Sequence, residues 1–193
     1  MVVAIIIAGG VGSRMGQKIP KQFISVENKP VIAYTLEAFQ AHPQIDAIEV
    51  VCLDGWESAL RAYAKQYGID KLKWVVPGGA SGQESIRNGV FNLEGVLSSE
   101  DICMIHDGVR PMLDADVITD VLRVCEVYGN AVTSMPYNEQ IFVIDEADPT
   151  TTTRFIPRET LRRVSTPQAY RFGVLDSKYH EAFEKGIGID GSN

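Results

Sequence analysis

The residues best suited to chemistry in this chain lie in a glycine-rich stretch near its start. Ala8 to Gly16 holds four glycines, and it follows Val2 to Ile7, an apolar and mostly β-branched run. Such a run is typical of a parallel strand that is buried on both faces. Because glycine lets the backbone turn sharply and approach a ligand, several N–H groups in such a loop can point at one anion. The stretch therefore predicts a phosphate-binding loop.

Two cations accompany this loop. Arg14 lies within it, and Lys21 follows in the run Pro20-Lys21-Gln22. An arginine offers a planar fork that matches phosphate oxygens, and a lysine offers a compact positive charge. We expect both side chains to contact the oxygens of a bound phosphate.

Two better-known phosphate loops do not match this stretch. A Walker loop requires a glycine five residues after its first, and the residue five after Gly10 is Met15. The dinucleotide fingerprint G-x-G-x-x-G would also need its third glycine at Met15, whereas the glycine comes one residue later. The spacing therefore disfavours a nicotinamide-dependent oxidoreductase. An ordinary turn between a strand and a helix stays open on these residues alone.

A second glycine-rich loop follows a predicted strand from Lys73 to Val76. It runs from Pro77 to Gly89 and contains Ser81 and Ser85, either of which could cap a helix. In an open α/β sheet, ligands bind outside the carboxyl ends of the strands. Both glycine-rich loops leave such ends, and two of them there are more than the fold itself needs, which favours a ligand-binding role over a simple helix entry.

A carboxylate follows another predicted strand, Asp101 to Ile105. The next residues are His106-Asp107-Gly108-Val109-Arg110-Pro111. Asp107 could hold Mg²⁺, which proteins bind with one or two carboxylates and substrate phosphates. The simpler alternative is a turn closed by an Asp107–Arg110 ion pair. We expect His106 to be a buried core histidine rather than a catalytic base.

Composition bounds the remaining possibilities. The chain has 193 residues, 45% of them hydrophobic, and a net charge of −7, so we expect one globular domain over residues 1–193 and no nucleic-acid partner. No apolar run approaches the ~20 residues of a membrane span, and no signal peptide is visible, which predicts a cytoplasmic protein without a membrane partner. The cysteines, Cys52, Cys103 and Cys125, fit no zinc pattern and are expected to be buried thiols.

Strand and helix patterns alternate along the chain, which predicts an α/β fold: a Rossmann-like, mostly parallel sheet flanked by helices. Strands are expected at residues 2–7, 45–53, 73–76, 101–105 and 130–135, and helices at 31–39, 56–67, 114–128 and 175–183.

The pattern changes after Pro136. The runs 141–144 and 151–156 read as a hairpin turning about 145–149, so we expect a projecting β-arm over about 136–156, whose exposed edge would prefer a partner. Beyond it, Arg162 and Arg163 are expected to be solvated charges on a short helix.

The loop sequences carry a family resemblance. A-G-G-x-G-S-R-M-G at Ala8 to Gly16, followed by P-K-Q, closely resembles the signature of the polyol-phosphate cytidylyltransferases, which have the nucleotide-diphospho-sugar transferase fold. H-D-x-x-R-P at His106 to Pro111 is also a signature of that family. Its members transfer CMP from CTP to 2-C-methyl-D-erythritol 4-phosphate or to ribitol 5-phosphate. The resemblance covers essentially the whole chain.

The resemblance implies specific roles. It makes Arg14 and Lys21 catalytic, and Asp107 a ligand of both Mg²⁺ and nucleotide that also faces the acceptor. Nucleotide binding is implied for Ala8, Gly9, Gly10, Gly12, Ser13, Gly79, Ala80 and Ser85, of which the last three would hold the cytosine. Acceptor binding is implied for Arg110, Arg158 and Thr166. In the family the arm exchanges between two subunits, which implies a homodimer with Arg158 reaching across it.

The chain departs from the family pattern at three places. Gly82 stands where many members have an arginine, and Glu139-Gln140 stands where members have Asp-Thr or Glu-Thr. The C-terminal part of the family domain, with a further lysine for the nucleotide phosphates, is expected to be missing.

These observations leave several functions open. The preferred hypothesis is 2-C-methyl-D-erythritol 4-phosphate cytidylyltransferase, an enzyme of isoprenoid precursor synthesis. Ribitol-5-phosphate cytidylyltransferase, which serves cell-wall or capsule polymers, is the alternative. A sugar-phosphate nucleotidyltransferase using UTP or GTP and a non-catalytic nucleotide-binding module are the others.

Overall fold

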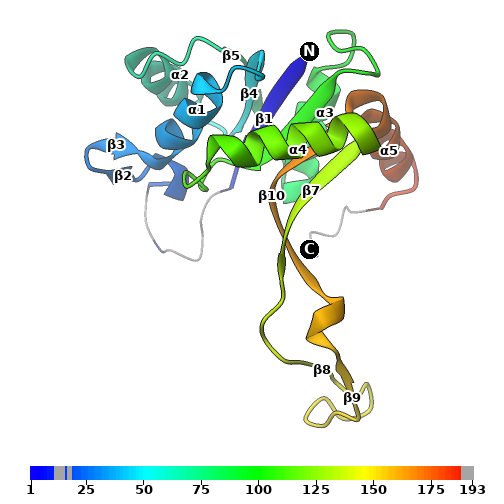
Figure 1. Cartoon of the computed structure of the whole chain (residues 1–193). Coiled ribbons are helices and arrows are strands. Elements are labelled where there is room, and N and C mark those ends of the chain that lie inside the picture. Colours follow the sequence, from blue (N-terminus) through cyan, green and yellow to red (C-terminus); the bar gives the residue numbers. More distant parts are fainter. Residues whose placement is uncertain (11–15, 17–18, 188–193) are drawn as a thin grey trace.

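A computed structural model describes residues 1–10, 16 and 19–187 of this chain. Within these residues, six strands form one mixed sheet in the order β5-β4-β1-β6-β10-β7 (Figure 1). The strands are β1 (Val2–Ala8), β4 (Ala47–Cys52), β5 (Leu72–Pro77), β6 (Ile102–Asp107), β7 (Asn130–Pro136) and β10 (Arg162–Arg171). The fold is the α/β class with a mostly parallel sheet that the sequence predicts.

The parallel strands β5, β4, β1 and β6 end at the same edge of the sheet. Ile7 of β1 pairs with Asp107 of β6, and Ala8 pairs with Cys52 of β4, which in turn pairs with Pro77 of β5. β10 runs antiparallel to both of its neighbours, so its early residues lie near the end of β6. The loops that follow these strand ends are thereby brought together.

Helices cover both faces of the sheet. α1 (Val31–Ala41), α2 (Glu57–Gln66) and α4 (Ala115–Tyr128) pack on one face, and α3 (Gly82–Asn92) and α5 (Phe172–Glu184) pack on the other. β1 shows why its sequence is apolar throughout: Ala4 and Ile6 join the first core, whereas Val3 and Ile5 join the second. Asp114 caps the start of α4, because its side chain accepts a hydrogen bond from the Asp116 backbone N–H.

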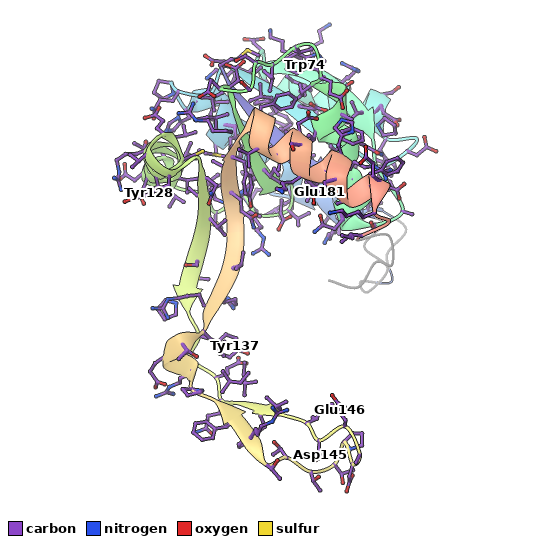
Figure 2. All side chains as sticks on the ribbon, turned by 90° about the vertical axis from the view of Figure 1, so that its right-hand side faces the viewer. Trp74, Tyr128, Tyr137, Asp145, Glu146 and Glu181 are labelled. Carbon is purple, nitrogen blue, oxygen red and sulfur yellow. The ribbon has the colours of Figure 1, made fainter. Side chains whose placement is uncertain are left out.

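A β-arm projects from the sheet (Figure 1). β7 and β10 continue past the body of the molecule as a ribbon and lead to a separate two-stranded sheet, β8 (Ile141–Val143) with β9 (Arg154–Ile156). Figure 2 shows Tyr137 where the ribbon meets this hairpin, and Asp145 and Glu146 at its tip. The projecting arm is thus confirmed.

The short helix expected around Arg162 and Arg163 is wrong. Both residues begin β10 and pair with Pro136 and Met135 of β7, and a short 3-10 turn, η3 (Arg158–Thr160), precedes them. Pairing with a strand distant in the sequence decides this conformation, and the local run of charges does not reveal it.

The remaining short elements lie between β1 and α1. They are the 3-10 turn η2 (Lys21–Phe23) and a small hairpin, β2 (Ser25–Val26) with β3 (Lys29–Pro30). All three cysteines are buried free thiols, as expected. In the described part of the chain, no helix is long and apolar enough to cross a membrane.

Candidate active site

The two glycine-rich loops meet at the shared edge of the parallel strands. The Gly78 N–H donates to the Cys52 carbonyl at 2.8 Å, which fixes the second loop against the end of β4. Gly9 and Gly78 then approach so closely that a Cβ built on Gly78 would lie 3.0 Å from the Gly9 Cα and 3.3 Å from the Cys52 carbonyl oxygen. A side chain on Gly78 would push the loops apart.

The second loop is shaped by two serines and a glutamate. Ser81 caps α3, because its side chain accepts from the Glu84 N–H at 3.1 Å. Ser85, which is buried, accepts from the Gly79 N–H and donates to the Ser81 carbonyl, both at 3.0 Å. The Glu84 carboxylate accepts from the Ala80 N–H at 2.7 Å. The N–H groups of Gly79 and Ala80 are thus held by side chains of the protein.

Gln22 ties the Pro20-Lys21-Gln22 run to the first loop. Its buried amide nitrogen donates to the Ala8 carbonyl at 2.6 Å and to the Gly10 carbonyl at 3.1 Å. The next residue, Phe23, is buried and stacks on Trp56 with ring centroids 4.5 Å apart. Lys21 is therefore anchored beside the end of β1. Gln22 has no role that could be assigned from the sequence, because its partners Ala8 and Gly10 lie on another element.

Asp107 and Arg110 form a tight turn at the end of β6. The Arg110 Nε donates to Asp107 Oδ2 at 2.5 Å, so the ion-paired turn considered as an alternative is present. The Asp107 side chain is nevertheless 38% exposed and that of Arg110 55% exposed, so both can also contact a ligand.

His106 holds this turn through a hydrogen bond to its backbone. It is 1% exposed, its Nε2 lies 3.0 Å from the Arg110 carbonyl, and its ring packs 5.3 Å from that of Phe39. The carbonyl can only accept, so Nε2 carries the proton in this bond. Burial lowers the pKa of His106, which keeps the imidazole neutral. The prediction of a buried core histidine is confirmed.

Two threonines hold the same turn from neighbouring elements. The Thr166 hydroxyl of β10 accepts from the Asp107 N–H at 3.3 Å. The Thr35 hydroxyl of α1, which is buried, donates to the Gly108 carbonyl at 3.0 Å. The structure thus brings Thr166 to Asp107, as a shared site requires. Thr35 was not singled out from the sequence, because nothing local marks it.

The structure does not bring Arg158 to this site within one chain. Arg158 lies in η3 on the arm, where it is exposed and its guanidinium contacts the Asn138 carbonyl and Glu159. Ala8, Gly9 and Gly10 lie at the end of β1, as predicted. Gly12, Ser13 and Arg14 lie outside the described residues.

A sequence profile of the family described as IspD, 2-C-methyl-D-erythritol 4-phosphate cytidylyltransferase, matches residues 2–191. The chain belongs to the IspD family. This IspD-family chain is a nucleotidyltransferase, since its relatives are named cytidylyltransferases.

Two curated relatives illustrate the range within this family. The IspD-family chain is 52% identical over 189 residues to a ribitol-5-phosphate cytidylyltransferase from Lacticaseibacillus paracasei, an alignment that covers 98% of this chain and 80% of that protein. It is 35% identical over 192 residues to a 2-C-methyl-D-erythritol 4-phosphate cytidylyltransferase from Alkaliphilus metalliredigens, with 98% of this chain and 77% of that protein covered.

A solved structure shares the fold. The crystal structure of 4-diphosphocytidyl-2C-methyl-D-erythritol synthase from Anaerococcus prevotii superimposes with a TM-score of 0.80 at 21% identity, and the match covers 98% of this chain and 78% of that one. The architecture of the IspD-family chain, with its mostly parallel sheet and flanking helices, is therefore that of IspD-type nucleotidyltransferases.

Proposed function

We propose that this IspD-family chain transfers CMP from CTP to ribitol 5-phosphate, releasing CDP-ribitol and pyrophosphate. The observation that carries this choice of acceptor is the 52% identity to the protein named for ribitol 5-phosphate, against 35% to the one named for 2-C-methyl-D-erythritol 4-phosphate. The loop signature alone suggested 2-C-methyl-D-erythritol 4-phosphate as the preferred acceptor, so the identities reverse the order of preference between the two acceptors. The second polyol phosphate is therefore the competing acceptor in the test below.

The reaction is an in-line displacement. A phosphate oxygen of the acceptor attacks the α-phosphorus of CTP, the new P–O bond forms, and the bond to pyrophosphate breaks. The acceptor phosphate is ionised near neutral pH, so the step depends on positioning and charge stabilisation rather than on a general base. A neutral, hydrogen-bonded His106 is consistent with this scheme.

The first loop supplies the triphosphate contacts in this proposal. Backbone N–H groups of Gly9 and Gly10, together with the following Gly12 and Ser13, cradle the phosphates, and Lys21 and Arg14 stabilise the charge that develops on the leaving pyrophosphate. Gln22 holds the start of this loop and adjacent Lys21 in place through its bonds to Ala8 and Gly10. Removing one preorganised charge of this kind typically costs ~10²–10³ in rate.

Asp107 is the residue that fits Mg²⁺. It offers a partly exposed carboxylate at the end of a buried strand, and Arg110 and the Thr166 hydroxyl hold it there. Mg²⁺ sites of substrate-phosphate enzymes use one or two carboxylates, with phosphate oxygens and water as the other ligands. Bound Mg²⁺ would reduce the repulsion between the two anionic substrates.

The second loop favours cytosine over uracil. Because the N–H groups of Gly79 and Ala80 are held by Ser85 and Glu84, the backbone groups that these residues can offer a base are carbonyl oxygens. The exocyclic amino group of cytosine is a donor, whereas the corresponding position of uracil is an acceptor. The arrangement therefore supports CTP as the nucleotide.

The acceptor site needs a second subunit in this proposal. Thr166 and Arg110 lie beside Asp107, but Arg158 lies on the arm. The arm exposes 61% of Phe142 and 69% of Phe155, which pair across the hairpin. Beside them is a hollow of about 370 Å³ that Arg158 also lines. Exposed apolar side chains on a two-stranded sheet favour burial against another copy, so we propose a homodimer in which the arms exchange.

We also propose that the enzyme works in the cytoplasm. Its three cysteines are unpaired and buried, and burial raises the pKa of Cys52 to about 12. Free thiols are typical of proteins in a reducing compartment.

The test is pyrophosphate release with CTP and Mg²⁺, using ribitol 5-phosphate, 2-C-methyl-D-erythritol 4-phosphate or no acceptor. We expect release with ribitol 5-phosphate and at least about tenfold lower kcat/KM with the other acceptor. Lys21→Ala should lose ~10²–10³ of the rate, whereas Lys65→Ala, on the exposed side of α2, should retain it. Because relatives are longer, both the printed chain and one carrying any residues that follow it in the gene are assayed.

Three outcomes would overturn the proposal. Preference for 2-C-methyl-D-erythritol 4-phosphate would show that this compound, and not ribitol 5-phosphate, is the acceptor. Turnover with UTP or GTP in place of CTP would indicate a sugar-phosphate nucleotidyltransferase. CTP binding in a calorimeter without turnover by either chain would indicate a nucleotide-binding module.

A further inference from the structure

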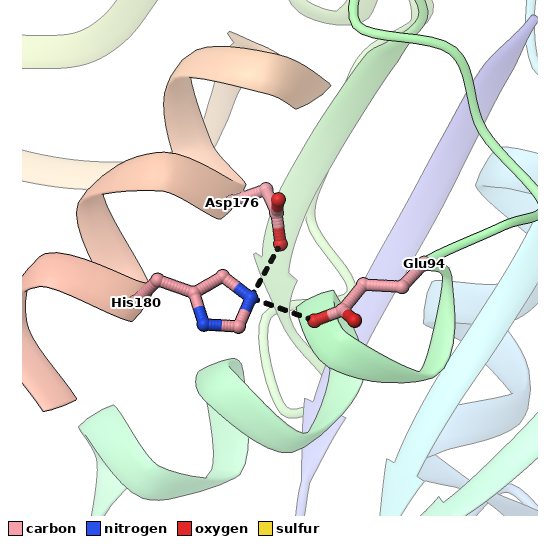
Figure 3. A group of neighbouring side chains, drawn as sticks. All are labelled: Glu94, Asp176 and His180. Carbon is pink, nitrogen blue, oxygen red and sulfur yellow. Dashed lines mark hydrogen bonds and ion pairs between the residues drawn. The ribbon is translucent and has the colours of Figure 1, made fainter. Parts of the chain in front are cut away.

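Three side chains with metal-ligating atoms meet between α3 and α5 (Figure 3). Asp176 and His180 lie on α5, and Glu94 lies just after the end of α3. The His180 Nε2 is 3.0 Å from Glu94 Oε1 and 3.6 Å from Asp176 Oδ1, and the three ligand atoms all lie within 4.8 Å of one another. Figure 3 shows both carboxylates directed at the same ring nitrogen.

The positions of these groups are fixed by the elements that carry them. Asp176 and His180 are four residues apart on a helix, so their side chains share one face of α5. The imidazole stacks on Phe91 of α3 with ring centroids 4.4 Å apart and an interplanar angle of 18°. This contact sets the plane of the ring, with Nε2 toward the carboxylates. A three-donor site is thus largely formed before any ligand enters.

The cluster is also short of positive charge. Two carboxylates face each other across one imidazole, so the cluster can hold at most one positive charge against two negative ones. Asp176 Oδ1 is buried and has no hydrogen-bond partner among the described residues. A buried oxygen without a donor is costly, and a cation between the two carboxylates would remove that cost.

We propose that Glu94, Asp176 and His180 bind one divalent transition-metal ion, of which Zn²⁺ is the representative, with water as the remaining ligand. Zinc takes imidazole nitrogen and carboxylate oxygen at about 2.0–2.2 Å, so two ligand atoms in a tetrahedral site lie about 3.4 Å apart. The separations of 3.0 and 3.6 Å from Nε2 already bracket that value. Imidazole favours such ions over Mg²⁺, which prefers oxygen ligands alone.

This site is separate from the proposed active site and would act on the fold. The second glycine-rich loop, which belongs to the proposed active site, leads into the start of α3. Glu94 lies at the opposite end of this helix, just after its last residue. Bound metal would join α3 to α5, two helices that are distant in the sequence and cover the same face of the sheet. We therefore expect binding to raise thermal stability without altering the requirement for Mg²⁺ in turnover.

The test uses untagged protein freed of metal with a chelator and kept without nucleotide. Isothermal titration with Zn²⁺ should give one site per chain, and zinc should raise the Tm. Glu94→Gln, Asp176→Asn and His180→Gln should each weaken binding at least about tenfold and remove the Tm increase. Glu181→Gln, on the same helix but paired with Lys178 and Lys185, is the matched control and should bind like the wild type.

A second measurement identifies the ligands directly. Co²⁺ replacing zinc should give visible absorption typical of a nitrogen–oxygen site, and His180→Gln should abolish it. His42 and His106, the other two histidines, are 3% and 1% exposed and cannot substitute without unfolding. Circular dichroism in chelator confirms that each variant is folded. No zinc binding, or equal binding by the three variants and the control, would overturn the proposal and leave the cluster as an ion-pair network.

Discussion

At the scale of single residues, Gln22 is the side chain that links the anchored segment to the phosphate loop. It is buried, and its amide nitrogen bridges the carbonyls of Ala8 and Gly10. No aliphatic residue of similar size could donate these bonds. The amide therefore sets the direction in which the backbone leaves β1, and with it the position of Lys21.

Gln22→Leu is expected to lower both stability and nucleotide affinity. Because the buried Ala8 carbonyl loses its donor and the more exposed Gly10 carbonyl loses a second bond, the free energy of unfolding should fall by about 1–3 kcal/mol. CTP affinity should fall with it, since the loop is no longer held in its binding shape. Urea unfolding and calorimetric titration with CTP measure the two effects. Gln66→Leu, on the exposed side of α2, is the control, and unchanged CTP affinity in Gln22→Leu would show that the amide only supports the fold.

Glu49 is a second buried polar residue, and it lies in the middle of β4. It has no exposed surface, and it pairs with Ile5 on one side and Trp74 on the other. Burial raises its pKa to about 8, and neither carboxyl oxygen has a hydrogen-bond partner among the described residues. The carboxyl group is therefore protonated in the folded protein at neutral pH.

Glu49→Gln is expected to remove a pH dependence of stability. Between about pH 4.5, the ordinary value, and about pH 8, folded Glu49 keeps a proton that the unfolded chain releases. The free energy of unfolding thus falls as pH rises through this window, by about 1.4 kcal/mol per unit of pH. The neutral amide of glutamine does not titrate, so it adds no pH dependence to the free energy of unfolding.

Urea unfolding at several values from pH 5 to 8.5 measures this free energy. Its dependence on pH should be flatter for Glu49→Gln than for the wild type, whereas exposed Glu100→Gln should follow the wild type. Parallel curves for all three proteins would contradict the prediction.

At the scale of elements, the active site depends on the contact between two loops. Gly9 and Gly78 touch backbone to backbone, so neither loop can shift without the other. Gly82 lies only four residues beyond Gly78, yet a Cβ there would meet nothing within 4 Å. The two positions therefore form a matched pair for testing whether this contact matters.

Gly78→Ala is expected to weaken CTP binding at least about tenfold, whereas Gly82→Ala should not. The new methyl group on Gly78 would press on the Gly9 Cα and the Cys52 carbonyl, which are backbone atoms with little freedom to move. At Gly82, in the first turn of α3, alanine meets open space and suits the helix better than glycine. Calorimetric titration with CTP compares the two variants. Equal affinities would mean that the separation of the loops does not control nucleotide binding.

The parallel part of the sheet could be predicted because each of its strands has a recognisable local sequence pattern. β1 and β4 are buried on both faces, so their sequences are nearly unbroken apolar runs. β10 could not be predicted in this way. Its first residues, Arg162 to Val164, are exposed, and its strand conformation comes from pairing with β7 and β6. Such pairing between segments that are distant in the sequence cannot be predicted from the local residue pattern.

The same distinction applies to the candidate site. Asp107 and the second glycine-rich loop could be found because polar or glycine-rich residues follow buried strands. Gln22 and Thr35 could not be assigned, since their roles come from partners distant in the sequence: Thr35 donates to Gly108, 73 residues away. Only the fold shows which buried polar groups are paired and with what.

At the scale of the whole molecule, the residues that the proposed reaction requires do not lie together within one chain. Asp107 is the last residue of β6 and lies beside Thr166 of β10, whereas Arg158 lies in η3. η3 belongs to the arm that projects from the body of the molecule, between β9 and β10. In the proposed homodimer, the arm of each subunit brings its Arg158 to the site of the other. A complete site then contains Lys21 from one subunit and Arg158 from its partner.

Mixing two inactive variants should therefore restore activity. Arg158→Ala lacks the arm arginine, and Lys21→Ala lacks the loop lysine, so each homodimer should be nearly inactive. When the two are unfolded together and refolded as an equal mixture, random pairing makes about half of the dimers mixed, and each mixed dimer has one complete site. Pyrophosphate release should then recover to about a quarter of the wild-type value. Mixing Arg158→Ala with the double variant Lys21→Ala/Arg158→Ala should restore nothing, because no subunit then supplies the arginine. Failure of the first mixture, with mixed dimers demonstrated by mass spectrometry, would show that Arg158 serves its own chain or does not contact the acceptor.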